Sequence, residues 1–275
     1  MDMVVSESGV DAAARYVANY CVAGSDLAAA AGLRADALAI LRQAGVVPDP
    51  TYKVSPYGVS SAIGNVGDTA RGDATGHFGP AVAPWLARAS LLLASVDALA
   101  LHEALINWLA TDLAAALRAR AAEARLFGWG HLFDEDRCDL ERVREEVASY
   151  WGGWMNGGWA VCLRRFDGHH LATKEIERRR IASLTQEGCA QSLSLDDRLA
   201  LFDAIARLES VLLPFAPHER PRGTPGVYID APSERYGLPR RLDGAAARGA
   251  VFRLQMAADP AETRTESTGT LTNRT

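Results

Sequence analysis

The stretch from Trp85 to Phe127 constrains the fold more than any other part of this 275-residue chain. Its forty-three residues contain neither glycine nor proline and are rich in alanine and leucine. Apolar residues between Leu91 and Leu113 recur with helical spacing, while polar residues such as Asp97 interrupt the run too often for a bilayer span. We therefore expect one long helix, or two in line, inside a soluble helical core.

Further helices are predicted on both sides of this stretch. Residues 11–48 read as three short helices, 173–184 as a helix capped by Thr173, and 195–213 as a helix that Pro214 ends. Residues 150–159 combine aromatic residues with glycines and are not expected to form an ordinary helix. Residues 227–230 are the one credible strand. The predicted fold class is mainly α, with a helix-turn-helix-like three-helix module followed by a larger helical body.

Composition along the chain suggests four segments. Residues 1–50 form the helix-turn-helix-like module, and residues 51–84, rich in Gly, Pro, Ser, Thr and Asp, are expected to be an irregular linker or loop. Residues 85–256 are the predicted helical main domain. Residues 257–275 have almost nothing to bury and are expected to be a disordered tail.

The charge balance argues against nucleic acid as a partner. The net charge is −5, and residues 1–50 carry three arginines against six carboxylates. Phosphate neutralisation needs an excess of Lys and Arg, which this module lacks. A regulator that contacts DNA or a partner protein through Arg34 and Arg42 remains the alternative function.

The thiols and the first twenty residues favour the cytoplasm. The four cysteines, Cys21, Cys138, Cys162 and Cys189, form no CxxC pair, which fits a reducing compartment. The first twenty residues carry Asp2, Glu7 and Asp11 and lack the pattern of a signal peptide, so export is not expected.

Motifs for metals and nucleotides are missing from the sequence. The six histidines form no HExxH and no ExxH of the di-iron type, so we predict no metal site. Neither GxGxxG nor GxxxxGK[ST] occurs, and there is no GxSxG elbow. The cofactor is therefore unassigned, as is the choice between an enzyme and a binding protein.

The strongest candidate site is the segment from Phe215 to Arg222. Pro217 and Pro221 bracket His218, Glu219 and Arg220 just after a predicted helix end, which stiffens the loop. His218 and Glu219 are the predicted catalytic acid or base, and Arg220 and Arg222 the predicted holders of an anionic group. The alternative is that these side chains pin the C-terminal segment to the helical body by salt bridges.

Trp159 and Lys174 are further candidates for substrate binding. The aromatic residues before Trp159 can form a wall for a flat ligand or simply pack in the core. Lys174 begins the charged face of a predicted helix, which we expect to be mostly solvated. That face comprises Lys174, Glu175, Glu177, Arg178, Arg179 and Arg180.

Four short motifs of the sequence belong together: Pro48–Tyr52, Trp159–Cys162, Thr173–Ile176 and, above all, Phe215–Arg220. They resemble an uncharacterised bacterial family labelled as natural-product biosynthesis proteins. The likeness spans roughly residues 10–240, and the chain departs from it at Gly223–Pro225, where serines and an arginine are expected. That departure weighs against anion binding by that stretch. The resemblance implies secondary metabolism in a bacterium as the setting.

These observations lead to one leading functional hypothesis. We expect a natural-product biosynthesis protein, an enzyme or an accessory protein, that acts on a small anionic metabolite. A structural partner of a biosynthetic enzyme, or a homo-oligomer, is a further expectation, with no membrane association.

Overall fold

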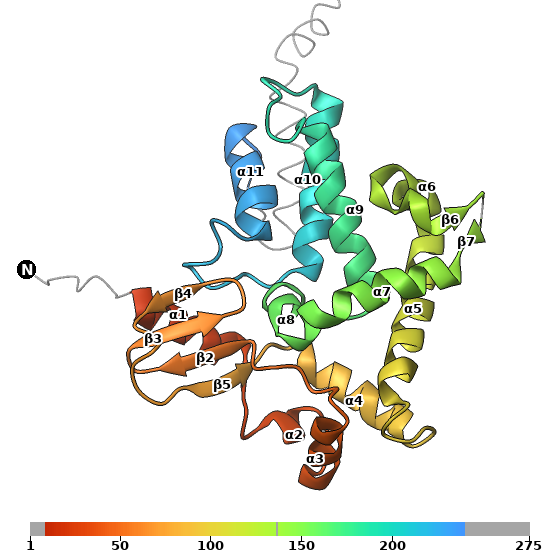
Figure 1. The fold of residues 1–275 in the computed structure, drawn as a ribbon. Helices are drawn as coiled ribbons and strands as arrows, with labels where there is room; N and C mark the ends of the chain where they lie inside the picture. The colour runs from red at the N-terminus through yellow and green to blue at the C-terminus, as the bar shows by residue number, and fades with distance from the viewer. Residues whose placement is uncertain (1–8, 136, 240–275) are drawn as a thin grey trace, which may run out of the picture.

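The computed structural model describes residues 9–135 and 137–239. Helices make up most of the regular structure in these residues, which confirms the mainly α prediction. Figure 1 shows a small sheet on one side of the molecule and the long helices on the other. The predicted tail at residues 257–275 lies outside the described residues.

The α-helices in the described part are α1 (Gly9–Tyr20), α2 (Leu27–Ala30), α3 (Ala35–Gln43), α4 (Val82–Leu93), α5 (Leu101–Ala119), α6 (Ala121–Ala124), α7 (Leu140–Met155), α8 (Gly158–Cys162), α9 (Gly168–Leu184), α10 (Leu195–Val211) and α11 (Ala231–Arg235). Three short helical turns accompany them: η1 (Arg125–Trp129), η2 (Gly130–Leu132) and η3 (Gly226–Asp230). Of these, η1 and η3 are wide π-type turns, and η2 is a 3₁₀ turn.

An antiparallel sheet of five short strands lies beside α1. The strands are β1 (Val22–Ala23), β2 (Tyr52–Ser55), β3 (Gly58–Ser61), β4 (Asn65–Gly67) and β5 (Thr75–Phe78), in the order β1-β5-β2-β3-β4. A second, two-stranded ribbon pairs β6 (Phe133–Asp134) with β7 (Arg137–Cys138). The prediction of an irregular segment at residues 51–84 is wrong, because four strands form there.

The register of β2 and β3 has a direct consequence for the site. Tyr52 of β2 lies opposite Ser61 of β3. Directly opposed residues in an antiparallel pair project from the same face of the sheet. The two hydroxyl groups therefore reach toward one point.

The N-terminal helices are present, but they are not separated from the sheet. α2 and α3 are joined by a turn at Gly32, whose φ of +67° is in the left-handed region. β1, which follows α1, pairs with β5, so the first fifty residues share a sheet with residues 75–78. α2 has only four residues.

The glycine-free stretch does not form one straight rod. α4 and α5 are separate helices that meet at an angle, as Figure 1 shows. The π-type turn η1 then follows α6, with Phe127 and Gly128 outside helical dihedral angles. The prediction of two helices in line is therefore wrong, because α4 and α5 both form but meet at an angle.

Three local predictions are also corrected. Residues 150–155 complete α7, so the aromatic and glycine-rich passage does begin as a helix. The helix α9 starts at Gly168, with Asp167 rather than Thr173 as its cap; the Asp167 carboxylate accepts a hydrogen bond of 2.8 Å from the His170 amide. Residues 226–230 form η3, so the strand predicted at 227–230 is wrong.

The aromatic residues before Trp159 contribute to the core. Trp154 is fully buried and stacks on Phe166 with ring centroids 4.1 Å apart. Trp85 packs edge-on against both rings, and its indole nitrogen donates to the Val46 carbonyl at 2.9 Å. These contacts join α4, α7 and the segment before α9, as the packing interpretation of this passage expects.

In the described residues, none of the helices combines the length and the apolar character that crossing a bilayer requires.

The crossing of α5 and α9 gives the first testable prediction. Gly168 lies so close to α5 that an added Cβ would be 2.3 Å from the Asp112 carbonyl carbon and the Leu113 nitrogen. Gly168→Ala must push two backbones apart, so we expect a loss of about 1–3 kcal/mol in the free energy of unfolding. Chemical denaturation followed by circular dichroism measures this loss.

Gly152→Ala is the matched control. Gly152 lies in α7 and has nothing within 4 Å of an added Cβ. This change should raise stability by up to about 1 kcal/mol, because alanine favours the helix. Equal effects of the two substitutions would contradict the close helix crossing.

Candidate functional site

The loop after α10 carries His218 and Glu219 and is fixed at both ends. At its start, the Leu213 amide donates to the Cys162 carbonyl at 2.8 Å, which sets the loop against the end of α8. Phe215 follows with a φ of +65°, unusual for a residue with a side chain. Backbone hydrogen bonds of 2.9 Å from Glu219 and Arg220 to the Ala216 carbonyl then close a tight turn.

Glu219 is the central buried group of this region. Its side chain is almost completely buried. The Tyr52 hydroxyl donates to its Oε2 at 2.6 Å, and the Ser61 hydroxyl donates to its Oε1. Both carboxylate oxygens are thus satisfied by hydroxyl groups from neighbouring strands of the sheet, which offsets part of the cost of burying the charge.

Two tyrosines and a thiol surround this carboxylate. Tyr16 of α1 packs edge-on against Tyr52, with ring centroids 5.9 Å apart. Burial, and next the charge of Glu219, raises the pKa of Tyr52 well above its usual value. Burial is also the main cause that raises the pKa of Tyr16, and it raises that of the Cys21 thiol to about 12. The Tyr52 hydroxyl therefore keeps its proton and remains a donor at physiological pH.

His218 lies beside Glu219 without a hydrogen-bond partner. Its Nε2 is 3.7 Å from Glu219 Oε1, which is too long for a hydrogen bond. Both ring nitrogens are buried and unpartnered among the described residues. Buried polar atoms are nearly always hydrogen-bonded in folded proteins. The two unpartnered nitrogens of this imidazole are therefore an exception that needs an explanation.

A hollow of about 310 Å³ opens beside this histidine. Its walls come from the β3–β4 turn, the end of α8 and the turn after Phe215. They include Gly64, Asn65, Cys162, His218, Glu219 and Arg222. Arg222 is exposed, and within the described part of the chain it has no ion pair, so its guanidinium is available to an anion.

Arg220 has a different position from its neighbours. Its Nε and Nη2 bind the two oxygens of Asp230 at 2.7 and 2.8 Å, and its Nη1 donates to the Pro214 carbonyl at 2.7 Å. The hydrogen bonds to Asp230 raise the pKa of Arg220. For Arg220 this geometry favours the alternative of a salt bridge that pins the C-terminal segment, here through η3.

Lys174 and Trp159 lie next to each other. The Lys174 ammonium sits 4.0 Å above the Trp159 ring and 3.9 Å from a Glu175 oxygen. Burial raises the pKa of the neighbouring Cys162 thiol, and the nearby charge of Lys174 opposes part of that rise. Because Cys162 also lines the hollow beside His218, it connects the two groups of candidates.

The expected solvated face of α9 is wrong for two of its residues. Lys174 is only 7% exposed, and Glu177 is fully buried, where Arg120 and Arg207 bind it. Arg120, just after α5, and Arg207 of α10 cover Glu177, and Trp159 of α8 covers Lys174, which spacing along α9 alone does not reveal.

Sequence reasoning missed Tyr52, Ser61 and Cys162. Tyr52 and Ser61 lie in strands of four residues each, too short for a clear alternation of polar and apolar residues. Cys162 ends the Trp159–Cys162 motif, which gave it no chemical role, and only the fold brings it to the hollow beside His218. Among the described residues, no cluster of three His, Cys, Asp or Glu side chains is placed to hold a metal ion.

The partly buried thiols give the second testable prediction. The raised pKa values of Cys21 and Cys162 leave little thiolate at pH 8, whereas Cys189 is exposed. Brief treatment with iodoacetamide at pH 8 should therefore modify Cys189 first. Peptide mass spectrometry identifies the labelled residue, and the chain in denaturant, where all thiols react, is the control. Rapid labelling of Cys21 in the native protein would contradict the raised pKa of this partly buried thiol.

Comparison with known proteins adds one finding. No curated protein and no solved structure matches this chain. Residues 101–237, from the start of α5 to just beyond α11, match the model of a family of unknown function (DUF6058). His218, Glu219, Arg222 and Cys162 lie within that match, whereas the sheet residues Tyr52 and Ser61 lie outside it.

Proposed function

We propose that this chain binds a small anionic metabolite in the hollow beside His218 and that His218 transfers a proton to or from it. The observation that carries the proposal is the buried imidazole whose two nitrogens have no partner among the described residues. It faces a hollow of about 310 Å³, at the small end of ligand sites.

The geometry suggests a division of roles around the bound molecule. The free guanidinium of Arg222 would hold a carboxylate or phosphate group. His218 would act as the general acid or base. Glu219 would act mainly by holding the loop that carries His218 in place, because both of its oxygens already accept hydrogen bonds from hydroxyl groups of the sheet.

We place this chemistry in bacterial secondary metabolism, in the cytoplasm. The four motifs that resemble natural-product biosynthesis proteins support that setting. The regulator alternative gains no structural support, since Arg34 is tied to Asp36 by hydrogen bonds of 2.6 and 3.1 Å. This pairing reduces the charge that the α2–α3 segment could offer to phosphate.

The third prediction concerns ligand binding. We would measure the thermal midpoint with a panel of small mono- and dicarboxylates and inorganic phosphate, and titrate each stabilising compound by calorimetry. At least one compound should stabilise the native chain, and Arg222→Gln should weaken its binding at least ten-fold, because the guanidinium contact is lost. Arg165→Gln, at another exposed arginine, is the control and should bind normally.

His218→Asn separates chemistry from binding. If the proposal holds, this variant still binds the compound that the native chain retains when isolated from its own host, but it no longer converts it. The proposal fails if none of the compounds stabilises the native chain, or if Arg222→Gln binds as tightly as Arg165→Gln.

A further inference from the structure

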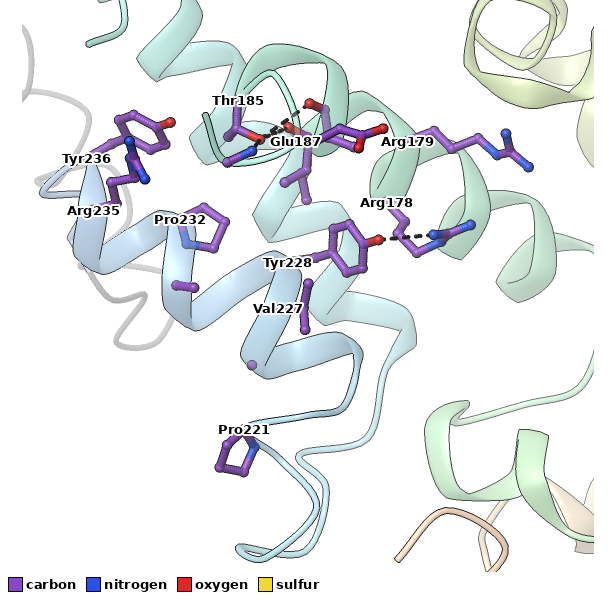
Figure 2. A pocket seen from close by; sticks show the side chains of 15 residues that line it. Arg178, Arg179, Thr185, Glu187, Pro221, Val227, Tyr228, Pro232, Arg235 and Tyr236 are labelled. Carbon is purple, nitrogen blue, oxygen red and sulfur yellow. Dashed lines mark hydrogen bonds between the residues drawn. The ribbon is translucent and has the colours of Figure 1, made fainter. Parts of the chain in front are cut away.

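A second and larger hollow lies between α9 and α11, apart from the His218 site. Its volume is about 690 Å³, within the range of sites for drug-sized molecules. Figure 2 shows it between the C-terminal half of α9 and the η3–α11 segment. None of the chemistry assigned to His218 uses these walls.

Two tyrosines form fixed aromatic walls in this hollow. The Tyr228 hydroxyl accepts a hydrogen bond of 3.1 Å from Arg178, and the Tyr236 hydroxyl donates to the Ala190 carbonyl at 3.0 Å. Val227, Pro232 and Ile181 add apolar surface to the lining. The polar ends of both rings are thus satisfied within the protein. Tyr236 is largely buried, and the Arg178 guanidinium lies 5.4 Å from the centre of the Tyr228 ring, so the hollow meets the parts of the two rings that these contacts leave open.

The lining holds three arginines and one carboxylate, in a chain whose net charge is −5. Glu175 neutralises Arg178, with contacts of 2.7 and 3.1 Å, and Figure 2 shows Arg179 extending away from the other lining residues. Arg235 is exposed and lies 5.8 Å from the centre of the Tyr236 ring. Among the described residues it has no carboxylate partner, so it is the cation free to bind an anion.

The turn that closes the hollow is held in an unusual conformation. Gln186, Glu187 and Gly188 have successive φ values of +49°, +55° and +82°. The Gly188 amide donates to the Thr185 hydroxyl at 3.1 Å, which fixes this turn at the end of α9. Left-handed residues other than glycine are costly and concentrate at functional sites.

From these observations we infer that the hollow between α9 and α11 binds an amphipathic aromatic acid. Its flat apolar part would lie against Tyr228 and Tyr236, and its anionic group would pair with Arg235. Glu187, whose carboxylate lines the hollow, would disfavour a ligand that carries a second negative charge. The inference goes beyond the proposed function, because it concerns another ligand at another site.

The test uses 8-anilinonaphthalene-1-sulfonate, a fluorescent aromatic sulfonate, with the full chain. One equivalent should bind the native protein. Val227→Trp fills part of the hollow at a half-exposed position and should weaken binding at least ten-fold. Leu99→Trp, at a side chain 95% exposed and outside the lining, is the matched control and should bind normally.

A second pair of measurements tests the charge and keeps the inference falsifiable if Val227→Trp disturbs the fold. Arg235→Gln should weaken binding at least five-fold, whereas Arg165→Gln and Arg222→Gln should not. N-phenyl-1-naphthylamine, which lacks the sulfonate, should bind weakly and equally to the native chain and to Arg235→Gln. The inference is overturned if the sulfonate does not bind, if Arg235→Gln leaves its affinity unchanged, or if Arg222→Gln abolishes its binding.

Discussion

The arrangement of the sheet against the helical part of the molecule depends on the hydrogen bonds that the buried carboxylate of Glu219 accepts from the sheet. A carboxylate in the interior is tolerated only where hydrogen bonds replace its water, and here the replacements come from Tyr52 and Ser61. These donors are distant in sequence, and they converge only because β2 and β3 pair in the observed register. Any shift of the sheet by one residue would point both hydroxyl groups away from Glu219.

This dependence makes the sheet part of the candidate site. The residues that face the hollow beside His218 come mostly from the part of the chain that matches the family of unknown function, but the groups that hold Glu219 do not. The same loop is tied on its other side by the Arg220–Asp230 pair, which connects it to η3. His218 is thus carried by a segment that is anchored at two points, as a proton-transfer group requires.

Sequence reasoning located the long helices and the loop, for identifiable reasons. α9 and α10 have sustained helical spacing, although the sequence placed the start of α9 several residues too late, and Pro217 and Pro221 mark the loop that holds His218. The strands between Tyr52 and Phe78 were not predicted, since segments of three or four residues show too little periodicity. The different roles of Glu219 and Arg220 could not be predicted from their adjacent positions in the sequence, because tertiary contacts with Tyr52 and Asp230 decide these roles. Lys174 and Glu177 are buried for the same reason, because tertiary contacts with Trp159 and with Arg120 cover them.

A double-mutant cycle on Tyr52→Phe and Glu219→Gln tests the central claim most directly, with Tyr57→Phe, in the turn between β2 and β3, as the control for Tyr52. The free energy of unfolding is measured by chemical denaturation for each single variant and for the double variant. If the Tyr52 hydroxyl stabilises the buried carboxylate, the two substitutions should be coupled by about 1 kcal/mol or more. The exposed Tyr57 should show no coupling to Glu219. Additive effects of Tyr52→Phe and Glu219→Gln would contradict the account, because they would mean that the sheet does not hold the carboxylate at the site.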